Sequence, residues 1–297
     1  MCRLFGSLSA GEIDFESHLI SSKTSLLAQS DANPKRLQGD GWGIGQLAPF
    51  GRPSIVISTE PIYQEKRRFA EEVGRVTGNT VIAHIRRASN PRGLARSAII
   101  RPPNQQPFSY KKWLFAHNGT VRIPNEVLPM AGRHRRLMKG NNDSEVFFRL
   151  LMNSIEKTGS VRDGVSQTVD SLWKAWKEAP AEVRKKQELP YVGLNFILSD
   201  GERLYSLCKY DGWKPATDDN WLSHPRPPRP LFEMCYRVEP DGNGIAVASE
   251  ITQPGGKWMP LKDGSLLEAR LDRGLMQFSV ALVPPHMALR NPPNTLK

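Results

Sequence analysis

The sequence "MCRLFGSLSA" (residues 1–10) places a cysteine directly after the methionine, at the start of a stretch expected to form a β-strand. A methionine followed by a residue as small as cysteine is normally removed, which would leave Cys2 as the first residue. Its α-amine, with a reference pKa of about 7.7–8.0, could then act as the base for its own thiol, whose reference pKa is about 8.5. The stretch raises the hypothesis of an N-terminal nucleophile, against the simpler alternative that Cys2 packs as a small apolar residue.

The composition is typical of a soluble globular protein, with 39% hydrophobic and 24% charged residues in a chain of 297. The first residues lack a basic segment followed by an apolar run, and no stretch approaches 18 consecutive apolar residues, so we expect neither a signal peptide nor a membrane span. The odd number of cysteines (Cys2, Cys208 and Cys235) fits a reducing compartment. These features predict a cytoplasmic location.

The net charge of +11 comes from 41 basic and 30 acidic residues. The basic residues are spread over small groups such as "EKRR" (residues 65–68) and "VRKK" (residues 183–186), without the alternating aromatic and basic pattern of RNA-binding strands. Paired zinc-ligand spacings are also missing from the sequence. We therefore expect a solvated basic surface that faces an acidic partner, with no nucleic acid and no metal bound.

The order of expected elements is strands, then helices, then strands again. The helical pattern of residues 141–159 begins near Asp143, because Asn142 and Glu145 resemble a capping box. Further helical patterns are marked by Phe15, Leu19, Leu26 and Leu27, by Phe69, Val73 and Val76, and by Val165, Val169, Leu172 and Trp176. Strands are expected at residues 79–89, 112–121, 191–210 (a hairpin), 233–240, 244–250, 265–271 and 275–282. This order predicts two packed sheets covered by helices, in one domain of residues 1–285 with a tail at residues 286–297.

The segment "GDGWGIG" (residues 39–45) holds four glycines but does not match a dinucleotide-binding fingerprint. The third glycine of that pattern is missing, and no strand is expected before it. A plain turn is the simplest interpretation; the alternative is that the backbone here passes close to a substrate or a catalytic residue.

Two expected strands end in polar motifs, "AHIRRAS" (residues 83–89) and "FAHNGT" (residues 115–120). Strand alternation sends Arg86 and Arg87 to opposite faces, so at most one of them can clamp a carboxylate, and the alternative is that both are solvated. The pair Asn118 and Gly119 can present a side-chain amide next to a backbone N–H, as an oxyanion hole requires, or can form a tight turn. We expect His84 and His117 to be buried structural histidines.

Asp143 begins the expected helix, where a carboxylate favours the positive end of the helix dipole. The same carboxylate could instead hold an ammonium group of a substrate. Its position alone does not decide between the two roles.

Taken in order, Cys2, "DGWGIG" (residues 40–45), "AHIRRAS", "FAHNGT" and "NDSEVFF" (residues 142–148) resemble the signature motifs of the class II glutamine amidotransferases. This N-terminal nucleophile (Ntn) hydrolase family has an α+β fold, a four-layer αββα sandwich of two antiparallel sheets. The resemblance extends to about residue 270 and is greatest to short stand-alone members, similar to the YafJ-type proteins and the γ-glutamyl hydrolase of ergothioneine biosynthesis.

The resemblance implies a role for each motif. Cys2 would be the nucleophile, and Asn118 and Gly119 would form the oxyanion hole. Arg86 would bind the α-carboxylate of glutamine and Asp143 its α-amino group. Trp42 and Gly43 would lie beside the nucleophile.

The implied reaction is cleavage of the γ-amide of glutamine, or of another small γ-glutamyl compound, through a γ-glutamyl thioester and without a cofactor. The alternatives are a catalytically silent scaffold and a glutaminase subunit that acts only with a separate ammonia-accepting partner protein. Two departures from the family affect the pocket wall: Arg87 replaces an aromatic residue and Gln106 replaces a histidine. Residues 87–108 and 212–230 are the candidates to line the leaving-group side.

Overall fold

The computed structural model describes residues 2–11, 14–210 and 232–283, so the expected tail and residues 212–230 lie outside the described residues. Two antiparallel sheets dominate the described part. The first has the order β11-β9-β10-β1-β4-β2-β3 and the second β13-β12-β8-β7-β6-β5. The strands are β1 (Arg3–Ser9), β2 (Trp42–Leu47), β3 (Ser54–Ser58), β4 (Thr80–Ile85), β5 (Phe108–Tyr110), β6 (Trp113–Val121), β7 (Tyr191–Ser199), β8 (Arg203–Cys208), β9 (Met234–Val238), β10 (Gly244–Ala248), β11 (Met259–Leu261), β12 (Ser265–Asp272) and β13 (Leu275–Leu282).

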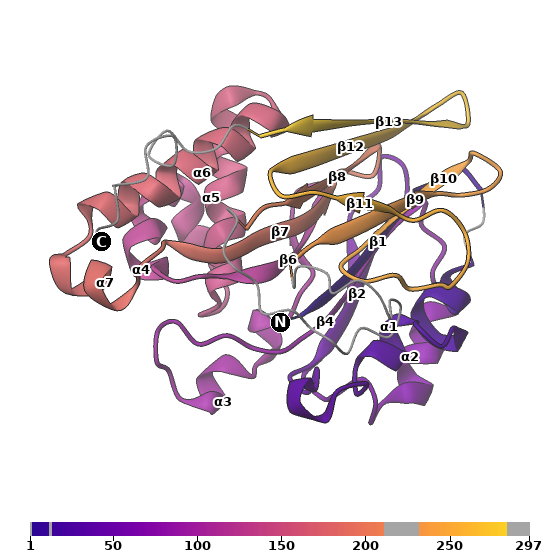
Figure 1. The fold of residues 1–297 in the computed structure, drawn as a ribbon, viewed down its shortest axis with the longest axis horizontal. Helices are drawn as coiled ribbons and strands as arrows, with labels where there is room; N and C mark the ends of the chain where they lie inside the picture. Colours follow the sequence, from indigo (N-terminus) through magenta and orange to yellow (C-terminus); the bar gives the residue numbers. More distant parts are fainter. Residues whose placement is uncertain (1, 12–13, 211–231, 284–297) are drawn as a thin grey trace, which may run out of the picture.

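Helices cover the outer face of each sheet, with α1 and α2 beside the seven-stranded sheet and α5 and α6 beside the six-stranded sheet (Figure 1). A separate apolar cluster fills each of the three spaces between these layers. The expected four-layer αββα sandwich is therefore confirmed. The helical segments are η1 (Ser17–Ser21), α1 (Leu26–Gln29), η2 (Pro34–Arg36), α2 (Lys66–Val73), α3 (Arg96–Ile99), η3 (Pro102–Asn104), α4 (Pro124–Val127), η4 (Leu128–Leu137), α5 (Asp143–Thr158), α6 (Val161–Glu178) and α7 (Ala181–Lys186).

Strand β1 lies in the middle of the seven-stranded sheet, between β4 and β10. Its side chains alternate: Phe5 packs toward the helices, whereas Leu4 and Leu8 pack between the two sheets. Gly6 allows a close approach of the sheets, since a Cβ there would lie 2.7 Å from a methyl carbon of Ile197. This strand carries Cys2 immediately before its first residue.

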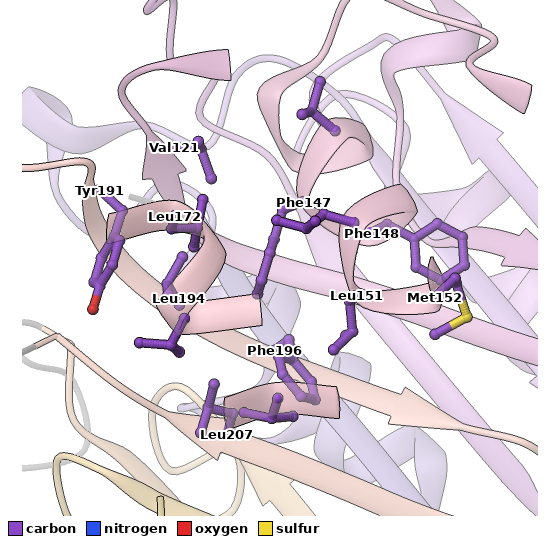
Figure 2. Packing of buried hydrophobic residues seen from close by; sticks show 14 of the residues in the cluster. Val121, Phe147, Phe148, Leu151, Met152, Leu172, Tyr191, Leu194, Phe196 and Leu207 are labelled. Atoms are coloured by element: carbon purple, nitrogen blue, oxygen red, sulfur yellow. The ribbon is translucent and has the colours of Figure 1, made fainter. Parts of the chain in front are cut away.

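Helix α5 covers the six-stranded sheet with an aromatic core (Figure 2). Phe147 and Leu151 pack over Phe196 of β7, and the ring centroids of Phe147 and Phe196 are 6.1 Å apart. The helix begins at Asp143 as expected, with the Asn142 side chain accepting a hydrogen bond from the backbone N–H of Ser144. This packing fixes the helix start against the end of β6.

The reciprocal half of the expected capping box is wrong. Glu145 accepts hydrogen bonds from the backbone N–H groups of Lys139 and Gly140 and pairs with Arg149, instead of returning to Asn142. The carboxylate therefore ties the preceding loop to the helix.

Two other expectations need correction. The pattern marked by Phe15 and Leu27 does not form one helix, because η1 and α1 are separate short segments. The glycine-rich segment of residues 39–45 does not form a turn, because the strand β2 begins within it at Trp42. The strand fits at this place only because residues 43 and 45 are glycines. A Cβ at Gly43 would collide with the carbonyl oxygen of Gln106, and a Cβ at Gly45 would lie 2.6 Å from a methyl carbon of Leu114. Within the described residues, none of the helices has both the length and the apolar character needed to cross a membrane.

Candidate active site

The thiol of Cys2 lies where β1 begins, beside the segment that follows β4. The register pairs Arg3 with Ile85, which puts Cys2 opposite Arg86. The sulfur lies 3.4 Å from both the backbone nitrogen and the carbonyl oxygen of Arg87, and Cys2 is 8% exposed. Burial raises the pKa of the Cys2 thiol, while the Arg87 N–H and the Arg86 guanidinium oppose that shift. A nearby base is therefore needed to form the thiolate.

Arg86 is buried, whereas Arg87 is exposed, as strand alternation predicts. The backbone of Arg86 extends the pairing with β2: its N–H donates to the carbonyl of Gly41 and its carbonyl accepts from the N–H of Asp40. The Arg86 side chain donates to the carbonyl of Ile99 at 3.1 Å. Burial lowers the pKa of the Arg86 guanidinium, which Cys2, Asp40 and Asp143 partly offset.

Asp143 is buried at the start of α5. Its carboxylate accepts hydrogen bonds from the Ser89 hydroxyl at 3.1 Å and from the backbone N–H of Val121 at 2.9 Å. Burial raises the pKa of the Asp143 carboxyl, and these hydrogen bonds and Arg86 lower it in part. The structure therefore buries this carboxyl group where the start of α5 meets the end of β6, and burial disfavours its ionised form.

Arg86 and Asp143 line the same pocket, together with Ser89 and Arg92. Its cavity volume is about 10 Å³, room for about one water molecule. Two cations and one anion thus line a common space, and contacts with Ile99 and Ser89 hold Arg86 and Asp143 in this conformation. A ligand with a carboxylate and an ammonium group would have to displace both contacts.

Asp143→Asn is expected to change the pH dependence of stability. In wild type the folded-state pKa lies above the ordinary value of 3.8, so the folded state retains the proton longer than the unfolded chain. Wild-type stability should therefore fall as pH rises through 3.8 toward the folded pKa, and the variant should lack this loss. The free energy of unfolding of Asp143→Asn, minus that of wild type, should rise from acid to neutral pH in urea titrations.

The control for this measurement is Asp163→Asn, which removes an exposed carboxylate from α6. A difference between Asp143→Asn and wild type that stays constant across the pH series would contradict the assigned shift.

Asn118 and Gly119 lie within β6, so the tight turn is wrong. Asn118 pairs with Asn195 and Gly119 with Leu194, and a β-bulge follows between Gly119 and Thr120. Asn118 is 1% exposed, and its side-chain oxygen has no hydrogen-bond partner among the residues that the structure describes. Only glycine fits at position 119, because a Cβ there would collide with the carbonyl of Gly193.

Alternation brings these groups from different strands to one layer. Leu4 of β1, Ile82 of β4 and Ala116 of β6 all pack between the two sheets. Counting in steps of two, Cys2, Arg86 and Asn118 continue those same faces. The thiol and the guanidinium therefore belong to one sheet, and the amide belongs to the sheet opposite.

The expectation that Trp42 lies beside the nucleophile needs correction. Its side chain is fully buried on the helix-facing side of the sheet, where it packs edge-on against Phe69 and donates to the Glu65 carboxylate at 2.8 Å. Trp42 and Ile44 share that apolar cluster, so Gly43 faces the space between the sheets. Gly43 is paired with His84 and packs under Gln106.

Sequence reasoning missed the residues that hold the loop over the site. Asp40 accepts from the backbone N–H of Ala88 at 2.8 Å and pairs with Arg96 at 2.7 Å. Ser89 and Gln106 were likewise not assigned a role, although Gln106 was noted as a departure. His84 and His117 are buried, as expected. No group of three or more His, Cys, Asp or Glu side chains suited to a metal ion occurs in the described ranges.

Comparisons with known proteins identify the family and the fold. The model of the family described as glutamine amidotransferases class-II matches residues 1–216. A search of the curated proteins gave no match. The fold is similar to that of a glutamine aminotransferase class-II domain protein from Silicibacter pomeroyi, with a TM-score of 0.62 and 17% identity over 96% of this chain and 100% of that one.

The fold is also similar to that of the glutamine phosphoribosylpyrophosphate amidotransferase from B. subtilis, with a TM-score of 0.56 and 15% identity. That match covers 94% of this chain and 49% of the other, and at such identities the two structures establish the fold alone. The family match covers most of the chain and includes Cys2, Arg86, Asn118 and Asp143. The chain belongs to the class II glutamine amidotransferases.

Proposed function

We propose that the protein hydrolyses the γ-amide of glutamine, or of a γ-glutamyl compound, by forming a γ-glutamyl thioester on Cys2. The observation that carries this proposal is the placement of Cys2 opposite buried Arg86, which shares a pocket with Asp143. A γ-glutamyl group has one carboxylate, one ammonium and one scissile amide. The site offers a cation, an anion and a thiol for them.

In the proposed mechanism, removal of Met1 frees the α-amine of Cys2, which accepts the thiol proton. The sulfur then attacks the γ-carbonyl carbon, and the developing oxyanion accepts hydrogen bonds from the Asn118 side-chain amide and the Gly119 N–H. The resulting ammonium returns its proton to the nitrogen of the leaving amine as the C–N bond breaks. Water, deprotonated by the same amine, cleaves the thioester and releases glutamate.

Arg86→Lys is expected to raise the KM for glutamine about tenfold, with a smaller effect on kcat. Lysine keeps the positive charge but cannot form the bidentate contact with a carboxylate, and one charge-assisted hydrogen bond contributes about 1.5–3 kcal/mol. The matched substrate is 4-aminobutanamide, which lacks the α-carboxylate. Wild type and Arg86→Lys should turn over this analogue with similar KM values; an equal KM increase for both substrates would reject the clamp.

The test of the proposed function is glutamate release by the purified chain from glutamine, glutathione and other γ-glutamyl amides. Mass spectrometry of the N-terminus should show that Met1 is absent. The amine released in parallel identifies the leaving group. A preparation without Met1 that releases glutamate from none of these compounds would contradict hydrolysis by the chain alone.

A second candidate, a glutaminase subunit active only with a partner, is favoured by the narrow pocket. Its volume of about 10 Å³ is too small for a glutamyl group. In addition, the Arg86 guanidinium already donates a hydrogen bond to the Ile99 carbonyl. In this alternative, a docked ammonia-accepting protein would shift residues 87–108 and open the pocket. Glutamate release that appears only on addition of a partner would distinguish it.

A further inference from the structure

We propose that Gln106 is a positioning residue for the oxyanion hole, an inference that rests on the proposed function. Gln106 is 2% exposed, and its side-chain amide binds both backbone groups of His117. The His117 N–H donates to Gln106 Oε1 at 2.7 Å, and Gln106 Nε2 donates to the His117 carbonyl at 3.2 Å. His117 directly precedes Asn118, so this clamp holds the backbone from which the oxyanion donors project.

The clamp completes a sheet edge at the point where a strand ends. Strand β5 pairs Phe108 with Phe115 of β6, and the same register continued by two residues puts Gln106 opposite His117. Strand β5 begins only at Phe108, so its backbone does not reach His117. The Gln106 side chain supplies the donor and acceptor that a longer strand would have offered.

Gln106 is itself held by the opposite sheet. A Cβ at Gly43 of β2 would collide with the Gln106 carbonyl, so these two backbones are in close contact. Gln106 Nε2 also lies 3.5 Å from Nε2 of His84 on β4. Burial and the Arg86 charge hold the pKa of the His84 imidazole well below its usual value, so the ring is neutral and can accept a hydrogen bond.

Gln106 thus links two halves of the site that come from different sheets. The seven-stranded sheet carries Cys2 and Arg86, and the six-stranded sheet carries Asn118 and Gly119. Attack on a carbonyl requires the sulfur and the oxyanion donors at a fixed separation. The Gln106 side chain bonds β6 and lies near His84 of β4, while the Gln106 backbone carbonyl contacts β2, so this residue is placed to maintain that separation.

The experiment is a double-mutant cycle between Gln106→Met and Asn118→Ala. Methionine fills a similar volume but removes both hydrogen bonds to His117. We expect Gln106→Met to lower kcat about 10–100-fold with KM changed less than about twofold, a smaller loss than that of an oxyanion donor itself. In the Asn118→Ala background the same substitution should lower kcat several-fold less than in the wild-type background, because only the Gly119 N–H then remains to be misplaced.

Gln105→Met is the matched control. Gln105 is equally buried at 2% exposure, but its side chain donates to the carbonyl of Asp40 at 2.8 Å and does not reach β6. Any effect of Gln105→Met should be the same with and without Asn118.

Alkylation of Cys2 by iodoacetamide, which needs no oxyanion hole, should proceed at the wild-type rate in Gln106→Met.

Gln106→His provides a second variant, for the case that Gln106→Met does not fold. A neutral imidazole has its donor and acceptor on opposite sides of the ring and can bond only one of the two His117 groups. Its kcat should therefore lie between those of wild type and Gln106→Met, with the same coupling to Asn118. If wild type is active and the Gln106 variants have an unchanged kcat, the inference about Gln106 is overturned while the proposed function stands. The same holds if their losses in kcat simply multiply the loss of Asn118→Ala. A wild type without any glutamate release overturns the proposed function and, with it, this role of Gln106.

Discussion

Cys2→Ala is expected to abolish glutamate release. The variant keeps the α-amine but loses the sulfur, and no other described cysteine can replace it, since Cys208 and Cys235 are buried in β8 and β9. Loss of the nucleophile in covalent catalysis removes the reaction path itself. Turnover should be measured as glutamate released from the substrate that wild type uses best.

The fold should survive this substitution. Cys2 precedes β1, and within the described part of the chain its sulfur makes two long hydrogen bonds of 3.4 Å, both with the Arg87 backbone, so the loss in stability should be about 1 kcal/mol. The controls are Cys208→Ala and Cys235→Ala, which should lower stability and retain activity. Wild-type turnover in Cys2→Ala would refute the mechanism.

A chain with a lysine inserted between Met1 and Cys2 separates the thiol from the amine. Methionine removal should be blocked, because lysine is large, and Cys2 would lose its free α-amine. We expect this variant to lack activity although its thiol is present. Activity at the wild-type level would show that another group acts as the base.

Asn118→Ala is expected to lower kcat about 10²–10³-fold with little change in KM. A hydrogen bond made mainly to the transition-state oxyanion contributes to kcat and not to substrate binding. Removal of one oxyanion donor typically costs about 2.7–4 kcal/mol, while the Gly119 N–H remains. Steady-state kinetics on a single γ-glutamyl substrate would measure both constants.

Stability separates this catalytic role from a structural one. The Asn118 side-chain oxygen is buried without a hydrogen-bond partner among the described residues, so its removal relieves an uncompensated polar atom. Asn118→Ala should therefore unfold no earlier than wild type in thermal melts. A large loss of stability together with a raised KM would indicate that Asn118 holds the fold and not the transition state.

Local patterns were sufficient to predict much of the fold. The strand after Cys2, the hairpin of β7 and β8 and the start of α5 at Asp143 all follow from side-chain alternation or from a helix cap. Strand β2 could not be predicted in this way. Its glycines disfavour a strand locally and are required only because Gln106 and Leu114 approach it from elsewhere in the chain.

The site shows the same division. Cys2, Arg86 and Asp143 lie in short motifs and could be proposed from the sequence, whereas the side of the sheet that Trp42 occupies depends on the register of β2 with β4. Asn-Gly favours a turn in isolation, yet pairing with β7 keeps Asn118 in a bulged strand. Tertiary pairing thus overrode the local preference at the proposed oxyanion hole.

The central position of β1 sets when the enzyme can form during synthesis. β1 pairs with β10, and the Leu4 N–H donates to the hydroxyl of Ser249, 245 positions along the chain. Contacts between residues so distant in sequence form slowly and only after both segments have left the ribosome. Cys2 is made more than 240 residues before β10 (Gly244–Ala248), so its strand is flanked on both sides only after that distant segment has been made. A nascent chain can therefore expose this thiol without being able to use it.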